Sequence, residues 1–350
     1  MSLGPIVIGH RGACGYVPEH TLASYFLAIQ YGADFVEPDL VMTRDAVLVA
    51  RHENEIGGTT DVAAHPEFAD RRTHRSIDGG QVEGWFTEDF TLAELKTLRA
   101  RERIPQVRPA NTRFDGQFEI PTFEEILVLV RAADELRAAR ARQLGLPVPA
   151  RIGVYPETKH PTYFAGRGLA LEAPIVEMLA RHGYRDRSAP VWLQSFEVGS
   201  LVTLGRLTQL PRVQLMDDNG APFDLVAKGD ARTYKDMSTP AGLAEVARYA
   251  QAIGPNKSQV IPRKADGSLG TPTELVAHAH AHNLAVHPWT FRAENFFLPL
   301  EFRHGEVPAE RGDLKSEILA HLHCGIDGFF TDQADLGVAA RAAFLKEQRG

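Results

Sequence analysis

Three acidic residues in this sequence have the types and spacing to hold a metal ion. Glu37 and Asp39 stand two apart in an apolar run, and on a β-strand such side chains point to the same face. Adjacent carboxylates repel each other unless a cation joins them, and their oxygen atoms suit Mg²⁺ and Ca²⁺. Glu157 follows another apolar run and would add a third ligand. The pattern indicates one divalent cation, Ca²⁺ or Mg²⁺, although an Arg or Lys paired with each acid would explain these residues equally well.

Two histidines, His10 and His52, each follow an apolar run and could transfer protons. A single histidine in such a place is more often structural, but two of them beside an acidic cluster favour catalysis. Imidazoles titrate near neutral pH, so one could remove a proton from an attacking hydroxyl while the other donates a proton to a departing alcohol. We therefore interpret His10 and His52 as an acid/base pair.

Two cationic residues, Arg11 and Lys159, stand next to these candidates. A phosphodiester gains negative charge when it is attacked, and fixed cations aimed at its oxygens stabilise that state. An ordinary salt bridge is the alternative for each cation. Glu19 would either orient Arg11 or only cap the helix that is expected to begin near Thr21.

Strands and helices that could position these residues alternate along the chain, because short β-branched runs are followed by longer amphipathic stretches. Eight such repeats in 350 residues predict an α/β fold of the (β/α)₈ barrel type. A doubly wound sheet is the alternative, but no Gly-x-Gly-x-x-Gly motif follows the first strand. The expected strands are Ile6–Gly9, Phe35–Leu40, Ile152–Glu157, Val191–Gln194, Val213–Met216, Gln259–Ile261, Ala285–Trp289 and Gly328–Thr331. The expected helices are Thr21–Tyr31, Phe123–Arg142, Leu169–His182, Ala241–Ala252, Glu274–His282, Leu314–His323 and Leu336–Glu347.

Two segments interrupt this repeat. Residues 54–120 are polar, are punctuated by Gly and Pro, and contain one helical candidate, Leu92–Arg101. Residues 293–312 are first aromatic and then charged. Both segments follow expected strands, where barrel enzymes carry substrate-selecting loops. We expect a single domain, residues 1–350, with an insertion at about 54–120 and a second long loop at about 293–312.

Composition argues against several classes of protein. A formal net charge of −7 makes a nucleic-acid partner unexpected, since such proteins usually carry a basic stripe. No run approaches the roughly 18 unbroken apolar residues of a membrane span, so no integral membrane segment is expected. Cys14 and Cys324 are too few for a disulfide framework and are expected to be free thiols. The N-terminus lacks a signal-peptide pattern; we expect a periplasmic or secreted protein if a signal was removed, and a cytoplasmic one otherwise.

In chain order these residues resemble the motifs of the glycerophosphodiester phosphodiesterase family, most closely its larger bacterial, periplasmic-type members. One departure is Glu53, where the family has Asp, and the extra methylene puts any role beside His52 in doubt. The motifs are His10-Arg11-Gly12, Pro18-Glu19-His20-Thr21, Glu37-Pro38-Asp39, His52-Glu53 and Glu157-Thr158-Lys159, with further similarity in Gln194-Ser195-Phe196, Val286-His287-Pro288-Trp289-Thr290 and Gly328-Phe329-Phe330-Thr331-Asp332.

The resemblance implies a (β/α)₈ TIM barrel with a lid-like insertion after the second βα unit. It implies a Ca²⁺ or Mg²⁺ site formed by Glu37, Asp39 and Glu157, an acid/base pair formed by the two histidines, and a phosphate-binding role for Arg11. Phe196 and Trp289 would either wall the glycerol or head-group pocket or simply pack near the barrel mouth. The family includes dimers, and a homodimer is therefore one expected assembly.

The expected function is metal-dependent hydrolysis of a small-molecule glycerophosphodiester, such as glycerophosphocholine or glycerophosphoethanolamine, to glycerol 3-phosphate and an alcohol. The attacking oxygen would belong to water, or to the substrate's neighbouring hydroxyl through a cyclic phosphate. One alternative is phospholipase D-like or phosphoinositide-type cleavage on the same barrel, which would require a lipid-facing surface. Another is a binding or adhesion protein that kept the scaffold and lost catalysis.

Overall fold

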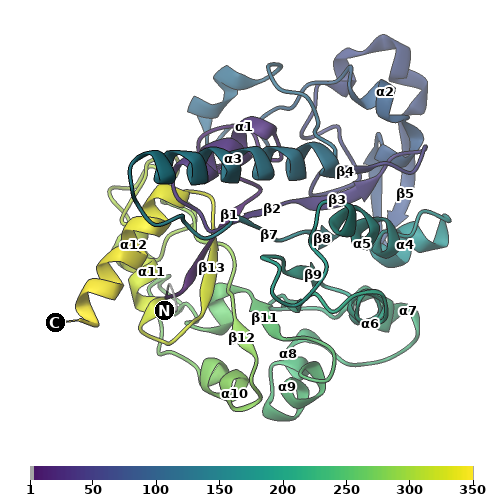
Figure 1. Ribbon diagram of the computed structural model, residues 1–350. Helices are drawn as coiled ribbons and strands as arrows, with labels where there is room; N and C mark the ends of the chain where they lie inside the picture. Colours follow the sequence, from purple (N-terminus) through teal and green to yellow (C-terminus); the bar gives the residue numbers. More distant parts are fainter. Residues whose placement is uncertain (1–3, 350) are drawn as a thin grey trace.

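Eight parallel strands close into a barrel at the centre of the computed structural model, which describes residues 4–349 (Figure 1). Hydrogen bonds from Asp327 N to Val286 O (2.9 Å) and from Phe330 N to Pro288 O (3.1 Å) join the last two strands and complete the closure. The molecule is therefore a (β/α)₈ TIM barrel, as predicted. The strands are β1 (Ile6–His10), β2 (Phe35–Glu37) continued by β3 (Asp39–Met42), β7 (Gly153–Val154) continued by β8 (Glu157–Thr158), β9 (Leu193–Ser195), β10 (Arg212–Met216), β11 (Ala252–Pro255), β12 (Ala285–Val286) and β13 (Gly328–Thr331).

Prolines divide the second and third barrel strands. Pro38 separates β2 from β3, and Pro156 lies between β7 and β8. Proline has no backbone N–H to donate to a neighbouring strand, so the hydrogen-bonded ladder is interrupted at each site. As a result β2 pairs with β1 and β7, whereas β3 pairs with β8. The predicted strand Phe35–Leu40 is present but broken at its middle.

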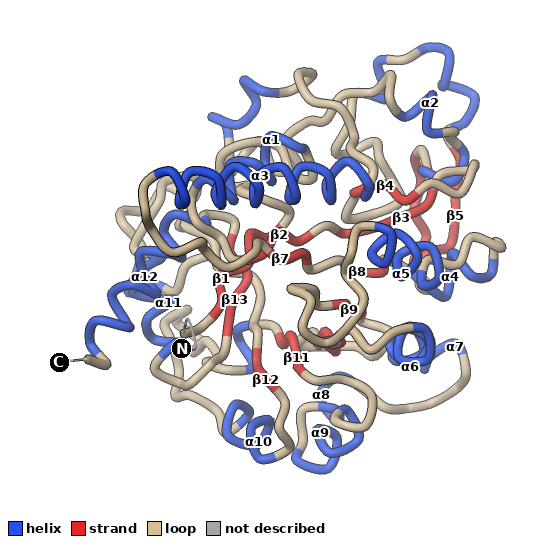
Figure 2. The backbone as a smooth tube through the Cα atoms, viewed as in Figure 1, coloured by secondary structure: helices blue, strands red, loops and turns tan. Residues whose placement is uncertain are grey.

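Helices surround the barrel, as the blue segments outside the red strands show in Figure 2. Thr122 and Glu125 form a capping box at the start of α3, and Thr21 caps α1 by accepting a hydrogen bond from Ser24 N. The α-helices are α1 (Leu22–Gln30), α2 (Leu92–Leu95), α3 (Phe123–Gln143), α4 (Pro161–Gly166), α5 (Glu172–Arg181), α6 (Val198–Leu207), α7 (Phe223–Ala227), α8 (Tyr234–Met237), α9 (Pro240–Val246), α10 (Leu275–Ala281), α11 (Leu314–Leu322) and α12 (Ala334–Glu347). The 3₁₀ helices are η1 (Val62–Ala64), η2 (Pro66–Arg71), η3 (Thr87–Asp89), η4 (Pro109–Phe114), η5 (Lys257–Gln259) and η6 (Leu300–Phe302).

The sixth barrel strand lies earlier in the chain than predicted. The expected strand Gln259–Ile261 is wrong, because η5 begins at Lys257 and the strand is β11. The expected helix Ala241–Ala252 ends at Val246, and Ala252 already pairs with Val213 of β10. The β-branched pair that suggested a strand, Val260 and Ile261, is instead buried outside β11 against α10 and α11. Burial of these two residues, rather than membership of the sheet, explains their apolar character.

The insertion at 54–120 lies inside the second βα unit rather than after it. It begins beyond β4 (Leu48–Ala50), which pairs antiparallel with β3, and it ends before α3. An antiparallel hairpin of β5 (Thr73–Ile77) and β6 (Gly80–Gly84) forms part of it. The predicted helix Leu92–Arg101 is shorter, since only α2 is helical. Phe90, Leu95 and Leu98 are buried in the same apolar cluster as residues of α1 and α3, so the insertion packs on the barrel.

The remaining general expectations concern cysteines and membrane spans. Cys14 is buried, Cys324 is half-buried, and both are free thiols as predicted. Among the helices of residues 4–349, none has the length and apolar character that crossing a membrane requires.

Candidate active site

A cavity of about 340 Å³ opens where the carboxyl ends of the barrel strands converge. In barrel enzymes this end of the strands carries the active site. The cavity brings together every residue predicted to bind metal, transfer protons or hold phosphate, apart from Glu19, which contacts Arg11 from behind. Its lining is His10, Arg11, Glu37, Asp39, His52, Glu157, Lys159, Gln194, Phe196, Leu215, Asp217, Trp289, Thr290, Arg292 and Phe330.

Glu37, Asp39 and Glu157 converge in this cavity, each offering a carboxylate oxygen within 4.8 Å of the others. All three are buried. Burial and the two neighbouring acids raise the pKa of Glu37 well above its usual range, and burial raises the pKa of Glu157 to about 8. Burial also disfavours the charged form of Asp39, but Lys159 and His20 outweigh it and hold the pKa of Asp39 well below its usual range.

The sequence left two explanations for these acids: a bound divalent cation, or an Arg or Lys partner for each acid. Their contacts in the structure distinguish the two. Lys159 Nζ lies 2.8 Å from Glu157 Oε1 and 3.7 Å from Asp39 Oδ1, so these two acids have cationic partners. Glu37 instead accepts hydrogen bonds from Arg11 N (2.8 Å) and from Gln194 Nε2 (3.0 Å). Arg11 Nε also lies 3.4 Å from Asp39 Oδ2, so two cations face three buried carboxylates, and among residues 4–349 Glu37 has no cationic partner of its own. Three oxygen donors at one point are a suitable set for a hard divalent cation. The residues therefore fit the predicted metal.

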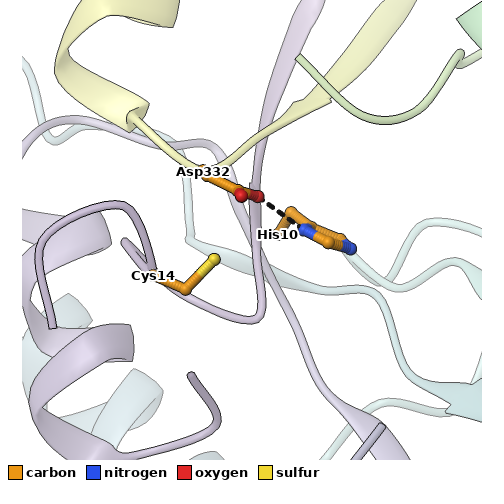
Figure 3. Close-up of side chains that lie close together, drawn as sticks. All are labelled: His10, Cys14 and Asp332. Carbon is orange, nitrogen blue, oxygen red and sulfur yellow. Dashed lines mark hydrogen bonds and ion pairs between the residues drawn. The ribbon is translucent and has the colours of Figure 1, made fainter. Parts of the chain in front are cut away.

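His10 ends β1 and is held by Asp332, which follows β13. His10 Nδ1 lies 2.6 Å from Asp332 Oδ1, and the other ring nitrogen faces away from this carboxylate (Figure 3). Burial lowers the pKa of His10 to about 4. A neutral His10 that donates its Nδ1 proton to Asp332 keeps a free lone pair on Nε2, which is the state required of a general base.

Cys14 lies beside His10 and Asp332 at a spacing that could suit a metal (Figure 3). Asp332 Oδ2 is, however, already paired with Arg108 Nη2 at 2.5 Å and with Arg292 Nε at 2.9 Å. Burial raises the pKa of the Cys14 thiol well above its usual range, so the thiolate that a metal needs is disfavoured. We interpret this group as the support of His10 and not as a second metal site.

His52 is held in the same manner as His10. Its Nδ1 forms a very short hydrogen bond with Glu53 Oε1, so the longer Glu53 side chain does reach the histidine. Partial burial, together with the nearby charges of Arg11 and Lys159, lowers the pKa of His52 to about 3, so this imidazole is neutral as well. Glu53, which stands where the family has Asp, therefore still contacts His52.

Arg11 follows directly after β1 in a left-handed backbone conformation, with φ of 55°. Its Nη1 donates to Glu19 Oε2 at 3.0 Å, and its Nε lies 3.4 Å from Asp39 Oδ2. Glu19 thus orients Arg11, while the capping role that was the alternative belongs to Thr21. Arg11 also lines the cavity, where it could meet a phosphate.

Phe196 and Trp289 form one wall of the cavity. Their ring centroids lie 5.7 Å apart in an edge-to-face arrangement, and Lys159 Nζ lies 5.8 Å from the centroid of Phe196. Trp289 Nε1 donates to Gly254 O at 2.8 Å, which fixes the indole. The two rings therefore both pack together and face the space where a substrate would sit.

Several residues of the site have no role in the sequence-based prediction. Gln194 and Asp332 lie in motifs that resemble the family, and only this place in the motifs indicated that they could belong to the site. Arg292 lines the cavity and pairs with Asp332. Arg103 and Arg108 come from the insertion, where nothing in their sequence context distinguishes them from surface arginines.

Comparison with known proteins places this geometry in context. The sequence pattern of the glycerophosphoryl diester phosphodiesterase family matches residues 10–336. A glycerophosphodiester phosphodiesterase of Arabidopsis thaliana is 36% identical over 340 residues, covering 94% of this chain and 83% of the relative. One of Haemophilus influenzae is 28% identical over 367 residues, covering 97% of this chain and 90% of the relative.

Solved structures share the fold. The chain superposes on an Oleispira antarctica phosphodiesterase, solved in complex with the product sn-glycerol-3-phosphate, with a TM-score of 0.60 and 19% identity, covering 97% of each chain. A glycerophosphodiester phosphodiesterase of Agrobacterium tumefaciens gives a TM-score of 0.55 at 18% identity, covering 96% of this chain and 99% of the other.

Proposed function

The chain belongs to the glycerophosphoryl diester phosphodiesterase family, and we propose that it hydrolyses soluble glycerophosphodiesters, such as glycerophosphocholine and glycerophosphoethanolamine, to glycerol 3-phosphate and an alcohol. The observation that carries this proposal is the cavity itself. The carboxylates of Glu37, Asp39 and Glu157, two neutral histidines and the cations Arg11, Lys159 and Arg292 all line a space of about 340 Å³. The sn-glycerol-3-phosphate bound to the Oleispira antarctica protein supports the choice of product.

Glu37, Asp39 and Glu157 would hold the divalent cation, Ca²⁺ or Mg²⁺. When bound, such a cation polarises a phosphate and increases the acidity of an attacking hydroxyl. With a cation held there, all three carboxylates could be ionised together, because the positive charge would offset the burial and the repulsion that raise the pKa of Glu37.

His10 and His52 would move the protons. Both rings are neutral and both direct Nδ1 to a carboxylate, so each presents Nε2 for chemistry. One histidine would accept a proton from the attacking hydroxyl, and the other, once protonated, would donate one to the departing alcohol. Arg11 and Lys159 would hold the phosphate oxygens and favour the state in which negative charge accumulates on them.

The test is the release of glycerol 3-phosphate from glycerophosphocholine by the purified protein before and after removal of metal. We expect turnover to vanish on chelation, to return with Ca²⁺ or Mg²⁺, and to fall by about 1,000-fold or more in His10→Gln and His52→Gln. His74→Gln is the matched control, because His74 lies at the surface of the insertion with a side chain that is 71% exposed. Full activity of either cavity variant, or cleavage of intact phospholipid vesicles in preference to glycerophosphocholine, would contradict the proposal.

A further inference from the structure

Arg103 of the insertion binds the two carboxylates that stand behind Arg11 and His52. Its Nε and Nη2 donate to the two oxygens of Glu19 at 2.8 and 2.6 Å. Its Nη1 and Nη2 donate to the two oxygens of Glu53 at 3.0 and 2.7 Å. One planar guanidinium thus joins the partner of Arg11 to the partner of His52.

Arg108 has the corresponding position behind His10. Its Nη2 lies 2.5 Å from Asp332 Oδ2, on the carboxylate whose other oxygen holds His10. Its Nε donates to Glu294 Oε1 at 2.7 Å, and its Nη1 donates to Cys14 O at 3.0 Å. Arg108 is buried, and it connects the insertion to the turns that follow β1 and β13 and to the loop after β12.

The two histidines therefore share one arrangement, in which Nδ1 contacts a carboxylate and the carboxylate contacts an arginine of the insertion. The donors of both arginines are directed to these protein groups at the distances given above. A guanidinium has five N–H donors, and four contacts from Arg103 to Glu19 and Glu53 leave it little capacity to bind a phosphate. Arg11 differs, since its Nε is buried without a hydrogen bond among the residues described.

We propose that Arg103 and Arg108 are positioning residues for the reaction, and that the insertion thereby completes the acid/base site instead of only covering it. Removing Arg103 would take the shared cation from the buried Glu19 and from Glu53, whose side chain is 36% exposed, so that neither carboxylate would keep its present orientation. Because Glu53 fixes His52, loss of Arg103 changes the orientation of the imidazole and acts on the chemical step. The inference rests on the proposed roles of His10 and His52.

A purely structural role is the competing explanation, in which Arg103 only fastens the insertion to the barrel. The two roles differ in what they do to a folded enzyme. A fastening residue alters the melting temperature and leaves kcat unchanged in the protein that remains folded. A positioning residue lowers kcat in the folded protein, with little effect on KM, because the lost interaction acts on the chemical step.

The experiment measures kcat and KM for glycerophosphocholine in Arg103→Ala, Arg103→Lys and Arg101→Ala. Arg101 lies in the same segment, pairs only loosely with Asp115 at 3.7 Å, and serves as the control. We expect kcat to fall about 10- to 100-fold in Arg103→Ala with KM within about twofold, and to stay near the wild-type value in Arg101→Ala. Arg103→Lys should recover little, because an ammonium cannot bridge two carboxylates in the plane of a guanidinium.

Two further measurements separate positioning from fastening. Millimolar guanidinium chloride should restore part of the lost kcat to Arg103→Ala and none to Arg103→Lys, whose side chain still fills the site. Combined with Glu53→Gln, the Arg103→Ala change should cost little more than the worse single variant, because both act through His52. If Arg103→Ala does not fold, Arg103→Lys and Glu53→Gln carry the same comparison, since both keep most of the packing.

Arg108→Lys tests the second arginine through His10, with circular dichroism and thermal melting to confirm the fold. A wild-type kcat in folded Arg103→Ala, or a loss that appears only in KM, would overturn the inference. Its failure is distinguishable from failure of the proposed function. If His52→Gln is inactive and the Arg103 variants are normal, only the inference falls; if His52→Gln is active, the proposed function falls as well.

Discussion

Asp39 and Glu157 lie directly opposite each other on the neighbouring parallel strands β3 and β8. His10 and Glu37 are paired in the same way across β1 and β2. The strand register therefore places the backbones of His10 and Glu37 side by side, and likewise those of Asp39 and Glu157, whatever rotamers the side chains adopt. Side-chain contacts refine this arrangement, but strand pairing creates it.

Replacement of the proposed metal ligands should weaken metal binding. We expect Glu37→Gln and Glu157→Gln to raise the Ca²⁺ or Mg²⁺ concentration needed for half-maximal heat of binding by about 10-fold or more, because affinity depends on the number of charged ligands. Isothermal titration of the metal-stripped protein measures this without reference to turnover. Glu135→Gln is the control, since that side chain is 74% exposed on α3. Unchanged metal binding in both variants would show that Glu37 and Glu157 are not metal ligands.

The contact between Asp332 and His10 predicts a loss of turnover in Asp332→Asn. An asparagine amide that donates to Nδ1 would force the proton onto Nε2, so His10 could no longer act as a base there. We expect kcat to fall by about 100-fold or more. Asp327→Asn is the matched control, because Asp327 also pairs with a histidine, His280 at 2.8 Å, but precedes β13 at the strand end opposite the cavity. A normal kcat in folded Asp332→Asn would show that His10 does not need this partner.

Burial of Glu197 predicts a pH-dependent stability. Burial raises the pKa of Glu197 from 4.5 to about 7, so the folded protein favours the neutral carboxyl. Between these values the unfolded chain loses its proton first, and the free energy of unfolding therefore decreases as the pH rises, by up to about 3 kcal/mol.

Glu197→Gln removes this dependence, and its stability relative to the wild type should increase from pH 4 to pH 8. Urea unfolding at several pH values gives the comparison. A constant difference between the two proteins across this range would mean that the pKa of Glu197 is not raised in the folded state.

The turn after β1 predicts that Gly12 cannot be replaced. Gly12 has φ of +88°, and a Cβ built there would lie 2.4 Å from Ser24 Oγ and 2.5 Å from the Ser24 carbonyl carbon. The contact with backbone cannot be relieved by a rotamer change, so we expect Gly12→Ala to lower the free energy of unfolding by about 2–4 kcal/mol. Gly58→Ala is the control, since no neighbouring group lies within 4 Å of the place that its Cβ would occupy and its φ is ordinary. Equal stability of the two variants, measured by thermal melting, would contradict the strain argument.

Much of the site could be predicted from the spacing of residues within short segments of the sequence. Glu37 and Asp39 are two apart, so they reach the same place even though Pro38 breaks the strand between them. His10 and His52 could be chosen because each ends an apolar run and stands near acids. The barrel could be inferred because short β-branched runs alternate with amphipathic helical stretches about eight times along the chain. These are properties of short segments, and short segments keep their geometry in the fold.

Tertiary structure alone decided which distant groups complete the site. Asp332 reaches His10 across 322 residues, and Arg103 reaches Glu19 across 84. No periodicity encodes such pairings, because they depend on barrel closure and on how the insertion folds back over the strand ends. The predicted position of the sixth strand was wrong for a related reason. Val260 and Ile261 are apolar because they are buried outside the sheet, and the sequence alone does not distinguish such residues from those of a buried strand. The amino-acid sequence thus determined the chemistry available at each strand end, whereas the closed barrel determined which partners hold that chemistry in place.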